Sequence, residues 1–272
     1  MPTIKTRAEY DAFPALNYSG SKVLISKNPA AYKAYIDAPR EETKALRIGS
    51  LTHALVLEPE VVSSRFAMLP DDIDRRTKAG KEAFEAFTLG AAGKSVVPAE
   101  DWGICANVAI SMVKAIAALG LNITATELMM SVDYCGVRLK SAIDAIATDK
   151  NGDEWIIDLK TTSDEASPKS FLNTARSYRY PLQAHFYRTV YHIQTGKRTK
   201  GFIFIVTEKE PPFLSASYQI GPELMTYAAM DFEQSVAAYK GCVALDEWPG
   251  YPSEVVEIDI PSKTASTPIS FA

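Results

Sequence analysis

The feature that most constrains this chain is an acid and a base placed inside a short, otherwise apolar stretch. Residues 155–159 read Trp-Ile-Ile-Asp-Leu after a turn at Asn151 and Gly152, which is the pattern of a short buried β-strand. Because side chains alternate along a strand, Asp158 and Lys160 face the same side of it. Burying either charge alone is costly, so they are expected to pair with each other or with another charged group.

The preceding segment repeats this pattern. Residues 137–148 predict another strand, in which Asp144 is the one carboxylate of an apolar run from residue 142 to residue 147. Two carboxylates and a lysine at neighbouring strand edges can hold a divalent metal ion and a phosphate together, because hard carboxylate oxygens suit such ions. The backbone carbonyl of Leu159 is a plausible third ligand. The plain alternative is a structural ion pair between Asp158 and Lys160 in an unrelated α/β protein.

Composition narrows the classes of function. With 272 residues, 47% of them hydrophobic, the chain can bury one substantial core, so one domain with elaborations is expected. No window approaches a membrane span, and residues 1–10 lack a secretory hydrophobic region. Three widely spaced cysteines provide neither a disulfide framework, a zinc knuckle, nor the four thiolates of an iron–sulfur cluster. We therefore expect a cytoplasmic protein without a membrane partner. The net charge of −4 argues against a generally basic nucleic-acid coat, although it leaves room for a local basic track.

Periodicity predicts helices around a small sheet. Helices are expected over residues 22–36 with an interruption near residue 28, and over 45–57, 79–89, 99–119, 168–178, 181–194 and 222–244. Strands are expected over residues 124–134, 137–148, 154–160, 202–207 and 214–220, the first three as an antiparallel meander. Residues 61–80 read as a charged, irregular segment. The predicted organisation is an N-terminal helical part (1–120), a core (121–248) and a tail (249–272), all in one compact domain.

Several polar residues outside the two acidic strands each allow two interpretations. His53, in the middle of the helix over residues 45–57, fits a hydrogen-bonded core residue, and Glu127 fits an exposed strand edge. Gln183 and Tyr187 are four positions apart, so they share one face of a helix, which fits the polar edge of a packed helix. The best local basic patch consists of three arginines, Arg176, Arg179 and Arg188.

These residues occur in an order that resembles the PD-(D/E)xK nucleases. Asp144 is followed fourteen residues later by Asp158, Leu159 and Lys160, with Ile143 where that motif usually has proline. More narrowly, the chain is similar to RecE-type phage exonucleases (exodeoxyribonuclease VIII), which are relatives of RecB-like and lambda-type exonucleases. The stretches that carry this narrower resemblance are residues 18–21 (Tyr-Ser-Gly-Ser), 28–32 (Asn-Pro-Ala-Ala-Tyr), 49–55 (Gly-Ser-Leu-Thr-His-Ala-Leu), 160–163 (Lys-Thr-Thr-Ser) and 181–187 (Pro-Leu-Gln-Ala-His-Phe-Tyr).

The resemblance implies an α/β fold with a restriction-endonuclease-like core, a mixed central sheet flanked by helices and an N-terminal helical elaboration. It implies that Mg²⁺, with Mn²⁺ as a substitute, is held by Asp144, Asp158, the Leu159 carbonyl and His53. The implied catalytic residues are Asp144, Asp158, Lys160, His53 and Glu127. The implied substrate-binding residues are Gln183, Tyr187, Arg176, Arg179 and Arg188.

The function that the resemblance implies is degradation of linear double-stranded DNA from its ends, 5′ to 3′, leaving 3′ single strands for an annealing recombinase. It also implies a ring-shaped trimer or tetramer, in which subunits pool a few arginines, and the cytoplasm of a bacterial host. The chain reads as a nuclease domain without a long N-terminal extension. Two further alternatives are a PD-(D/E)xK endonuclease of restriction or resolvase type and a non-catalytic DNA-binding protein on the same fold.

Overall fold

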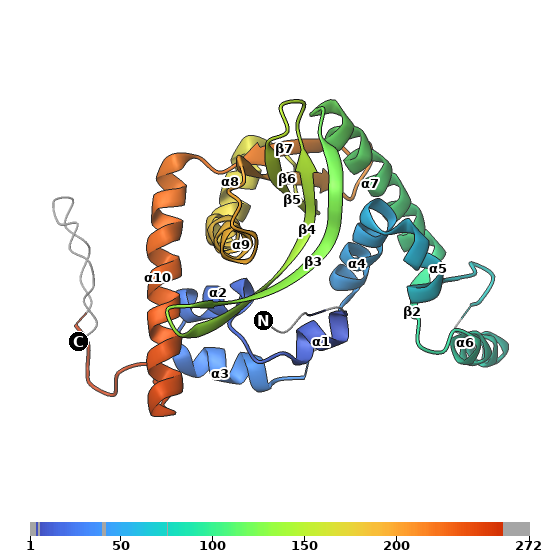
Figure 1. The fold of residues 1–272 in the computed structure, drawn as a ribbon. Helices are drawn as coiled ribbons and strands as arrows, with labels where there is room; N and C mark the ends of the chain where they lie inside the picture. Colours follow the sequence, from blue (N-terminus) through green and yellow to red (C-terminus); the bar gives the residue numbers. More distant parts are fainter. Residues whose placement is uncertain (1–3, 5, 40–41, 75, 258–272) are drawn as a thin grey trace.

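A five-stranded mixed sheet organises the protein in the computed structural model, which describes residues 4, 6–39, 42–74 and 76–257. The strands lie in chain order: β3 (Asn122–Tyr134), β4 (Val137–Thr148), β5 (Glu154–Thr162), β6 (Gly201–Glu208) and β7 (Ser215–Gln219). The first three form the antiparallel meander, β6 pairs with β5 in parallel, and β7 returns antiparallel. This mixed sheet with flanking helices confirms the predicted fold class (Figure 1).

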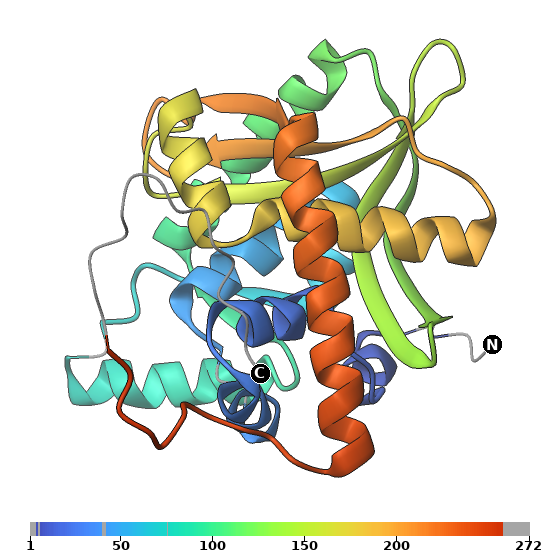
Figure 2. The same ribbon diagram turned by 90° about the vertical axis from the view of Figure 1, so that its left-hand side faces the viewer.

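Helices cover both faces of the sheet, and the alternation of side chains along β5 decides which residues pack against the helices on each face. On one face, Ile157 and Leu159 pack with α7 (Ala99–Ala118) and the end of α4 (Lys44–Leu57). On the other face, Ile156 packs with α8 (Pro168–Ser177) and α9 (Tyr180–Thr195). The long α10 (Pro222–Leu245) crosses outside α9 (Figure 2). Asp158 and Lys160 thus belong to the face covered by α8 and α9.

The N-terminal helices join the same core. The predicted interruption near residue 28 separates two helices, α2 (Tyr18–Ser26) and α3 (Pro29–Asp37). Their caps are Asn17 and Asn28, whose side chains each accept a backbone hydrogen bond at 2.8 Å, so α2 begins at Tyr18 rather than at the predicted residue 22. Both helices pack in one buried cluster with α9, α10 and the far ends of β3 and β4. The division of the chain at residue 120 stays a prediction.

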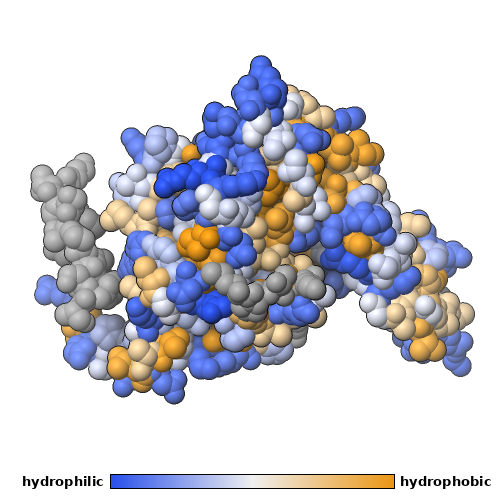
Figure 3. All heavy atoms as spheres, in the orientation of Figure 1, coloured by the Kyte–Doolittle hydropathy of each residue, from blue (hydrophilic) through white to orange (hydrophobic). Residues whose placement is uncertain are grey.

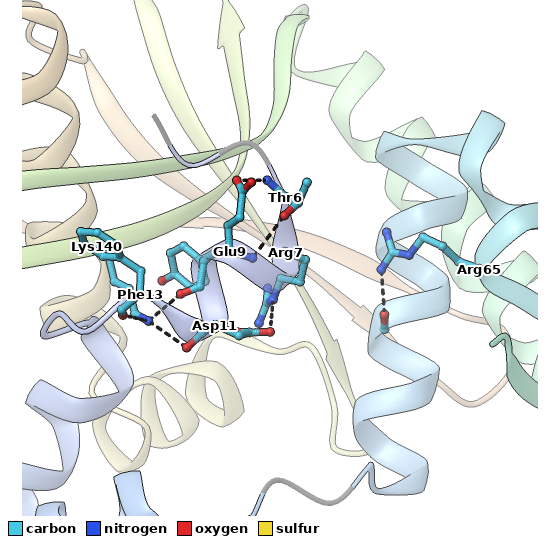
Figure 4. A network of polar contacts seen from close by, with 9 residues as sticks. Thr6, Arg7, Glu9, Asp11, Phe13, Arg65 and Lys140 are labelled. Carbon is cyan, nitrogen blue, oxygen red and sulfur yellow. Dashed lines mark hydrogen bonds and ion pairs between the residues drawn. The ribbon is translucent and has the colours of Figure 1, made fainter. Parts of the chain in front are cut away.

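A buried lysine holds the first helix, α1 (Arg7–Ala12), against the sheet. Lys140 on β4 donates hydrogen bonds to the carbonyls of Tyr10 at 2.6 Å and Phe13 at 2.7 Å (Figure 4). These carbonyls lie at the C-terminal end of the helix, where its dipole is negative, and the Tyr10 carbonyl also accepts a hydrogen bond from the Phe13 N–H at 3.3 Å. A capping box between Thr6 and Glu9 fixes the other end.

The segment predicted to be irregular, residues 61–80, contains regular structure. It holds the end of η1 (Pro59–Val61), α5 (Val62–Arg65), β1 (Phe66–Leu69) and the start of α6 (Lys78–Gly90). β1 pairs in parallel with β2 (Ser95–Pro98), a partner about thirty residues away that no local pattern reveals. The predicted tail, residues 249–272, lies partly outside the described residues, which end at 257.

The expectation that no segment approaches the length of a membrane span needs correction. Within the described part of the chain, α7 alone is long and apolar enough to cross a membrane by length and composition, with a third of it buried. Core helices of this length pass the same test, and α7 packs against α4 and β6. Its outer face carries the exposed side chains of Ile110 and Val113. Apolar surface gathers near the upper right of Figure 3, where α7 lies in Figure 1.

Candidate active site

The site is built where β4 and β5 separate. Their pairing runs from Thr148 and Glu154 to Ala145 and Ile157 and then stops. At the next step, Asp144 Oδ2 accepts a hydrogen bond from the Leu159 backbone N–H at 2.8 Å. The carboxylate thus takes the place of a strand carbonyl. The separation lets an acidic side chain lie between the two strands.

His53 reaches this separation from α4. Its Nε2 lies 3.0 Å from the Leu159 carbonyl oxygen, and its Nδ1 lies 3.6 Å from Asp144 Oδ2. Leu51, Ala54 and Leu57 are buried along the same helix, and their packing sets its position against the core. The structure therefore brings together three of the four predicted metal ligands: His53, Asp144 and Leu159.

Glu127 completes a cluster on the neighbouring strand. The register of β3 and β4 sets Glu127 directly opposite Asp144, because Thr126 pairs with Ala145 and Leu128 pairs with Ile143. Ligand atoms of His53, Glu127 and Asp144 all lie within 4.8 Å of one another. Glu127 has a φ of 48°, a left-handed conformation uncommon for glutamate and often found at functional sites.

Burial and a second carboxylate explain the electrostatics of this cluster. Burial, followed by repulsion from Asp144, raises the pKa of Glu127 to about 7. A carboxylate this close disfavours the ionisation of Glu127, and a divalent cation bound beside it would reverse that effect. Carboxylate, carbonyl and imidazole groups together form a donor set that fits such a cation.

Asp158 lies next to this cluster, on β5. Its side chain is 2% exposed, its Oδ1 accepts a hydrogen bond from Gln183 Nε2 at 2.6 Å, and its Oδ2 lies 2.5 Å from Lys160 Nζ. Burial raises the pKa of Asp158 to about 6, although the Lys160 ammonium acts in the opposite direction. Burial alone would lower the pKa of Lys160, but the carboxylates of Asp158 and Asp144 outweigh it and raise that pKa, so the amine stays charged.

Gln183 contacts Asp158, which its spacing from Tyr187 did not indicate. The resemblance implied that it positions substrate, whereas in the structure its amide binds Asp158. Gln183 is 4% exposed, and α9 presents it inward between buried Leu182 and Ala184. Tyr187, one turn further along α9, packs edge-on against Tyr18, and burial raises its pKa well above the ordinary range. Substrate contacts for both residues stay predictions.

The three arginines do not form one free basic patch. Arg179 Nη1 lies 2.7 Å from Asp231 Oδ2 on α10. Arg188 donates to the Thr199 carbonyl at 3.1 Å and to its hydroxyl at 3.2 Å. Arg176 is exposed in the last turn of α8. Two of the three therefore tie parts of the fold together, and binding of DNA by any of them stays a prediction.

Residues that no sequence pattern singled out also surround Lys160. Its Nζ lies 5.0 Å from the centre of the Tyr180 ring and 5.9 Å from that of Phe204. Tyr180 belongs to α9 and Phe204 to β6, which are brought together only by the tertiary fold. Aromatic faces attract cations, so the two rings help to hold the ammonium beside Asp158.

Comparison with solved structures supports the fold. A protein of Eubacterium rectale described as a candidate exonuclease superposes with a TM-score of 0.59 at 12% identity, covering 93% of this chain and 92% of that one. At this identity the likeness shows the fold alone. An alkaline exonuclease from Laribacter hongkongensis gives a TM-score of 0.34 at 10% identity, covering 85% of this chain and 91% of that one, which is too low to bear on the fold.

A search of curated proteins finds no match. A family described as "PDDEXK-like domain of unknown function (DUF3799)" matches residues 19–259. This span contains all the residues of the candidate site, from His53 on α4 to Gln183 on α9. Because the match covers most of the chain, the chain belongs to this family of PDDEXK-like domains, and thereby to the PD-(D/E)xK nuclease superfamily.

Proposed function

We propose that this protein is a metal-dependent exodeoxyribonuclease that degrades linear double-stranded DNA from its ends, 5′ to 3′. The observation that carries the proposal is the cluster of His53, Glu127 and Asp144 at the separation of β4 and β5, next to the Asp158–Lys160 pair. Membership of the PD-(D/E)xK superfamily supports a nuclease that acts on DNA. The 5′ to 3′ direction rests on the RecE-type sequence resemblance.

Each residue of the site has a distinct task in this proposal. Asp144, Asp158, the Leu159 carbonyl and His53 would hold Mg²⁺, with Glu127 beside them and Mn²⁺ as a substitute. When bound, such an ion supplies Lewis-acid polarisation of the scissile phosphate and acidifies water. Lys160, which stays charged, orients the attacking water or offsets the negative charge that develops on the phosphate. Gln183 holds the Asp158 carboxylate in one orientation.

The proposal extends to assembly and pathway. We propose a ring-shaped trimer or tetramer that encloses the duplex, acting in the cytoplasm of a bacterial host. The 3′ single strands that it leaves would serve an annealing-type recombinase. A ring is compatible with the net charge of −4, because several subunits can direct a few cations inward while each outer surface stays acidic.

The test is digestion of end-labelled linear duplex beside covalently closed circular DNA, in Mg²⁺ and in EDTA. We expect loss of the 5′ label first, an intact circle, and no product in EDTA. Lys160→Ala should slow cleavage about 100-fold or more, since one electrostatic group at a developing charge is commonly worth that much. The matched control is Lys150→Ala, which removes an exposed lysine from the β4–β5 turn.

Each other outcome has a definite meaning. Cleavage of the closed circle would replace the proposal with an endonuclease of restriction or resolvase type. Loss of the 3′ label first would reverse the proposed direction. Binding of DNA without any product, in both Mg²⁺ and Mn²⁺, would indicate a non-catalytic DNA-binding protein. Undiminished cleavage by Lys160→Ala would remove the proposed site from the reaction.

A further inference from the structure

Three stacked aromatic rings lead from the sheet to the surface beside the candidate site. Phe204 on β6 is fully buried, and Tyr180 stacks on it with ring centres 5.3 Å apart and planes at 22°. Tyr178 stacks on Tyr180 in turn, at 5.8 Å and 21°. The Tyr178 residue is 53% exposed, so this aromatic column (Phe204, Tyr180 and Tyr178) ends in a ring that faces solvent.

The outer end of the column is held in place by the junction between α8 and α9. Tyr178 ends α8, and its carbonyl accepts a hydrogen bond from the Tyr18 hydroxyl. The next residue, Arg179, has a left-handed φ of 58° and is paired with Asp231. A non-glycine residue in this conformation is strained, and such strain persists where the surrounding contacts fix it. The junction therefore holds the backbone that carries the exposed ring in one position.

Two lysines lie along the column. Lys160 lies 5.0 Å from the centre of the Tyr180 ring, and Lys22 on α2 lies 5.4 Å from that of Tyr178. Lys22 is half-buried, and both burial and the nearby Lys160 lower its pKa. Among the described residues, no carboxylate acts on the pKa of Lys22. Two neighbouring cations, of which Lys22 has no acidic partner among the described residues, suit an anionic ligand.

Exposed aromatic rings that alternate with cations suit one class of ligand. The base of an unpaired nucleotide stacks on an aromatic face whatever its sequence, and the phosphates of the same strand bind lysines. Within a paired duplex the neighbouring pairs cover the base faces and only the end pair exposes one, so a duplex cannot use the ring along its length. The column therefore favours a single strand of nucleic acid over a closed duplex.

We propose that Tyr178 is a stacking platform for one base of an unpaired DNA strand, and that Lys22 binds a phosphate of that strand as it passes towards Lys160. This inference rests on the proposed nuclease function and adds to it the state of the substrate at the site. The terminal nucleotides of the cut strand are separated from their complement before they reach Asp158. Lys22 then exchanges its contact with the Tyr178 ring for the phosphate.

The test measures binding without cleavage, so that its result is independent of catalysis. A fluorescein-labelled single-stranded oligothymidine and a blunt hairpin duplex are titrated with full-length protein in EDTA and followed by anisotropy. We expect Tyr178→Ala to weaken binding of the single strand about fivefold or more, since one stacked base is commonly worth that much. Tyr178→Phe and Tyr178→Trp should stay within about twofold of wild type, because both keep a ring face.

Charge and exposure controls complete the design. Lys22→Gln should lower the salt dependence of single-strand binding by about 0.7 in the log–log slope, which is the value for one lost phosphate contact. Lys27→Gln removes an exposed lysine at the end of the same helix and should leave the slope unchanged. Tyr251→Ala removes another exposed tyrosine, 85% exposed beyond α10, and should leave binding unchanged.

A second readout detects the stack itself. With 2-aminopurine as the terminal base of the strand, stacking on Tyr178 should quench its fluorescence in the wild type and in Tyr178→Phe but not in Tyr178→Ala. Equal affinities and equal emission for wild type and Tyr178→Ala would overturn the inference. It would also be overturned if Tyr178→Ala weakened binding of the blunt duplex as much as binding of the single strand. If linear DNA were still degraded in that case, the proposed nuclease function would stand while the stacking platform failed.

Discussion

At the scale of single residues, one amide contacts the carboxylate of Asp158. Gln183 Nε2 donates a hydrogen bond to Asp158 Oδ1, and burial raises the pKa of Asp158 to about 6. A hydrogen bond to a charged group is worth about 1.5 kcal/mol, so Gln183→Leu should raise that pKa by about one unit. Since a protonated Asp158 cannot hold a metal ion, the acid limb of the pH–rate profile should move to higher pH by the same amount.

The measurement is the initial rate of linear-duplex cleavage in Mg²⁺ on both sides of pH 6. Gln194→Leu, which replaces an exposed glutamine of the same helix, is the matched control and should leave the profile in place. An unchanged acid limb in Gln183→Leu would mean that Asp158 does not limit activity at low pH. A fall in rate that is equal at every pH would assign Gln183 a role in binding substrate instead.

Glu127 gives a prediction about stability. Its pKa of about 7 in the folded protein lies above its ordinary value of 4.5, so folding favours the protonated form. This stabilisation is fully present below pH 4.5 and is lost as the pH rises through 7. Glu127→Gln stays neutral at every pH, so in EDTA it should unfold about 2–4 °C above wild type at pH values above 7, with a smaller difference in acid.

Thermal unfolding in EDTA, in one buffer below pH 7 and one above it, tests this expectation. Glu165→Gln, in the exposed loop after β5, is the control and should give no pH-dependent difference. A Glu127→Gln variant with the same shift in Tm at both pH values would contradict the buried-carboxylate explanation. Gln is matched to Glu in shape, so the left-handed backbone at this position affects both proteins equally.

At the scale of elements, the first helix depends on a side chain from the sheet. An isolated helix as short as α1 does not form in water, so its position depends on tertiary contacts. Lys140→Met keeps the aliphatic stem but removes the donor to the carbonyls of Tyr10 and Phe13, which should cost about 1–3 kcal/mol. Hydrogen exchange should rise over residues 7–13 more than elsewhere.

Lys150→Met, in the exposed β4–β5 turn, is the control for the loss of a lysine. Arg7 of α1 acts electrostatically on Glu127, so release of α1 should also raise the pKa of that carboxylate. Unchanged exchange over residues 7–13 in Lys140→Met would mean that the capping box and the ring of Tyr10 suffice to hold the helix.

The elements with local signals could be predicted from sequence. The three-stranded meander and the helices α4 and α9 followed from the local periodicity of their residues. The boundary between α2 and α3 was placed correctly, but the start of α2 was not, since Asn17, Ser19 and Ser21 are all acceptable caps locally. β1 and β2 were missed because each is four residues long and its partner is distant.

The candidate site was predictable in its residue types but not in its connections. The alternation of side chains along a strand placed Asp158 and Lys160 on one face of β5, and the two residues do form an ion pair. The hydrogen bond from Leu159 N–H to Asp144 depends on where two strands part, which no alternation pattern encodes. Gln183 and Tyr187 were placed on one face of α9, but only the packed fold decides that this face meets Asp158.

At the scale of the whole molecule, the site concentrates negative charge in a protein whose net charge is already −4. The Asp144 carboxylate disfavours the ionisation of Glu127 and of Asp158, and this repulsion acts against the folded state when no cation is present. A divalent ion that binds the folded protein alone should therefore stabilise the whole chain.

We expect saturating Mg²⁺ to raise Tm by about 5 °C, because a ligand at 100 times its Kd contributes about 2.7 kcal/mol and each kcal/mol shifts Tm by about 2 °C in a protein of this size. Asp144→Asn keeps an acceptor for the Leu159 N–H but removes a charged ligand, so most of this shift should disappear. Asp164→Asn, in the exposed loop after β5, should keep all of it. Equal shifts in the two variants would place metal binding elsewhere in the chain, because only the first alters the cluster of His53, Glu127 and Asp144.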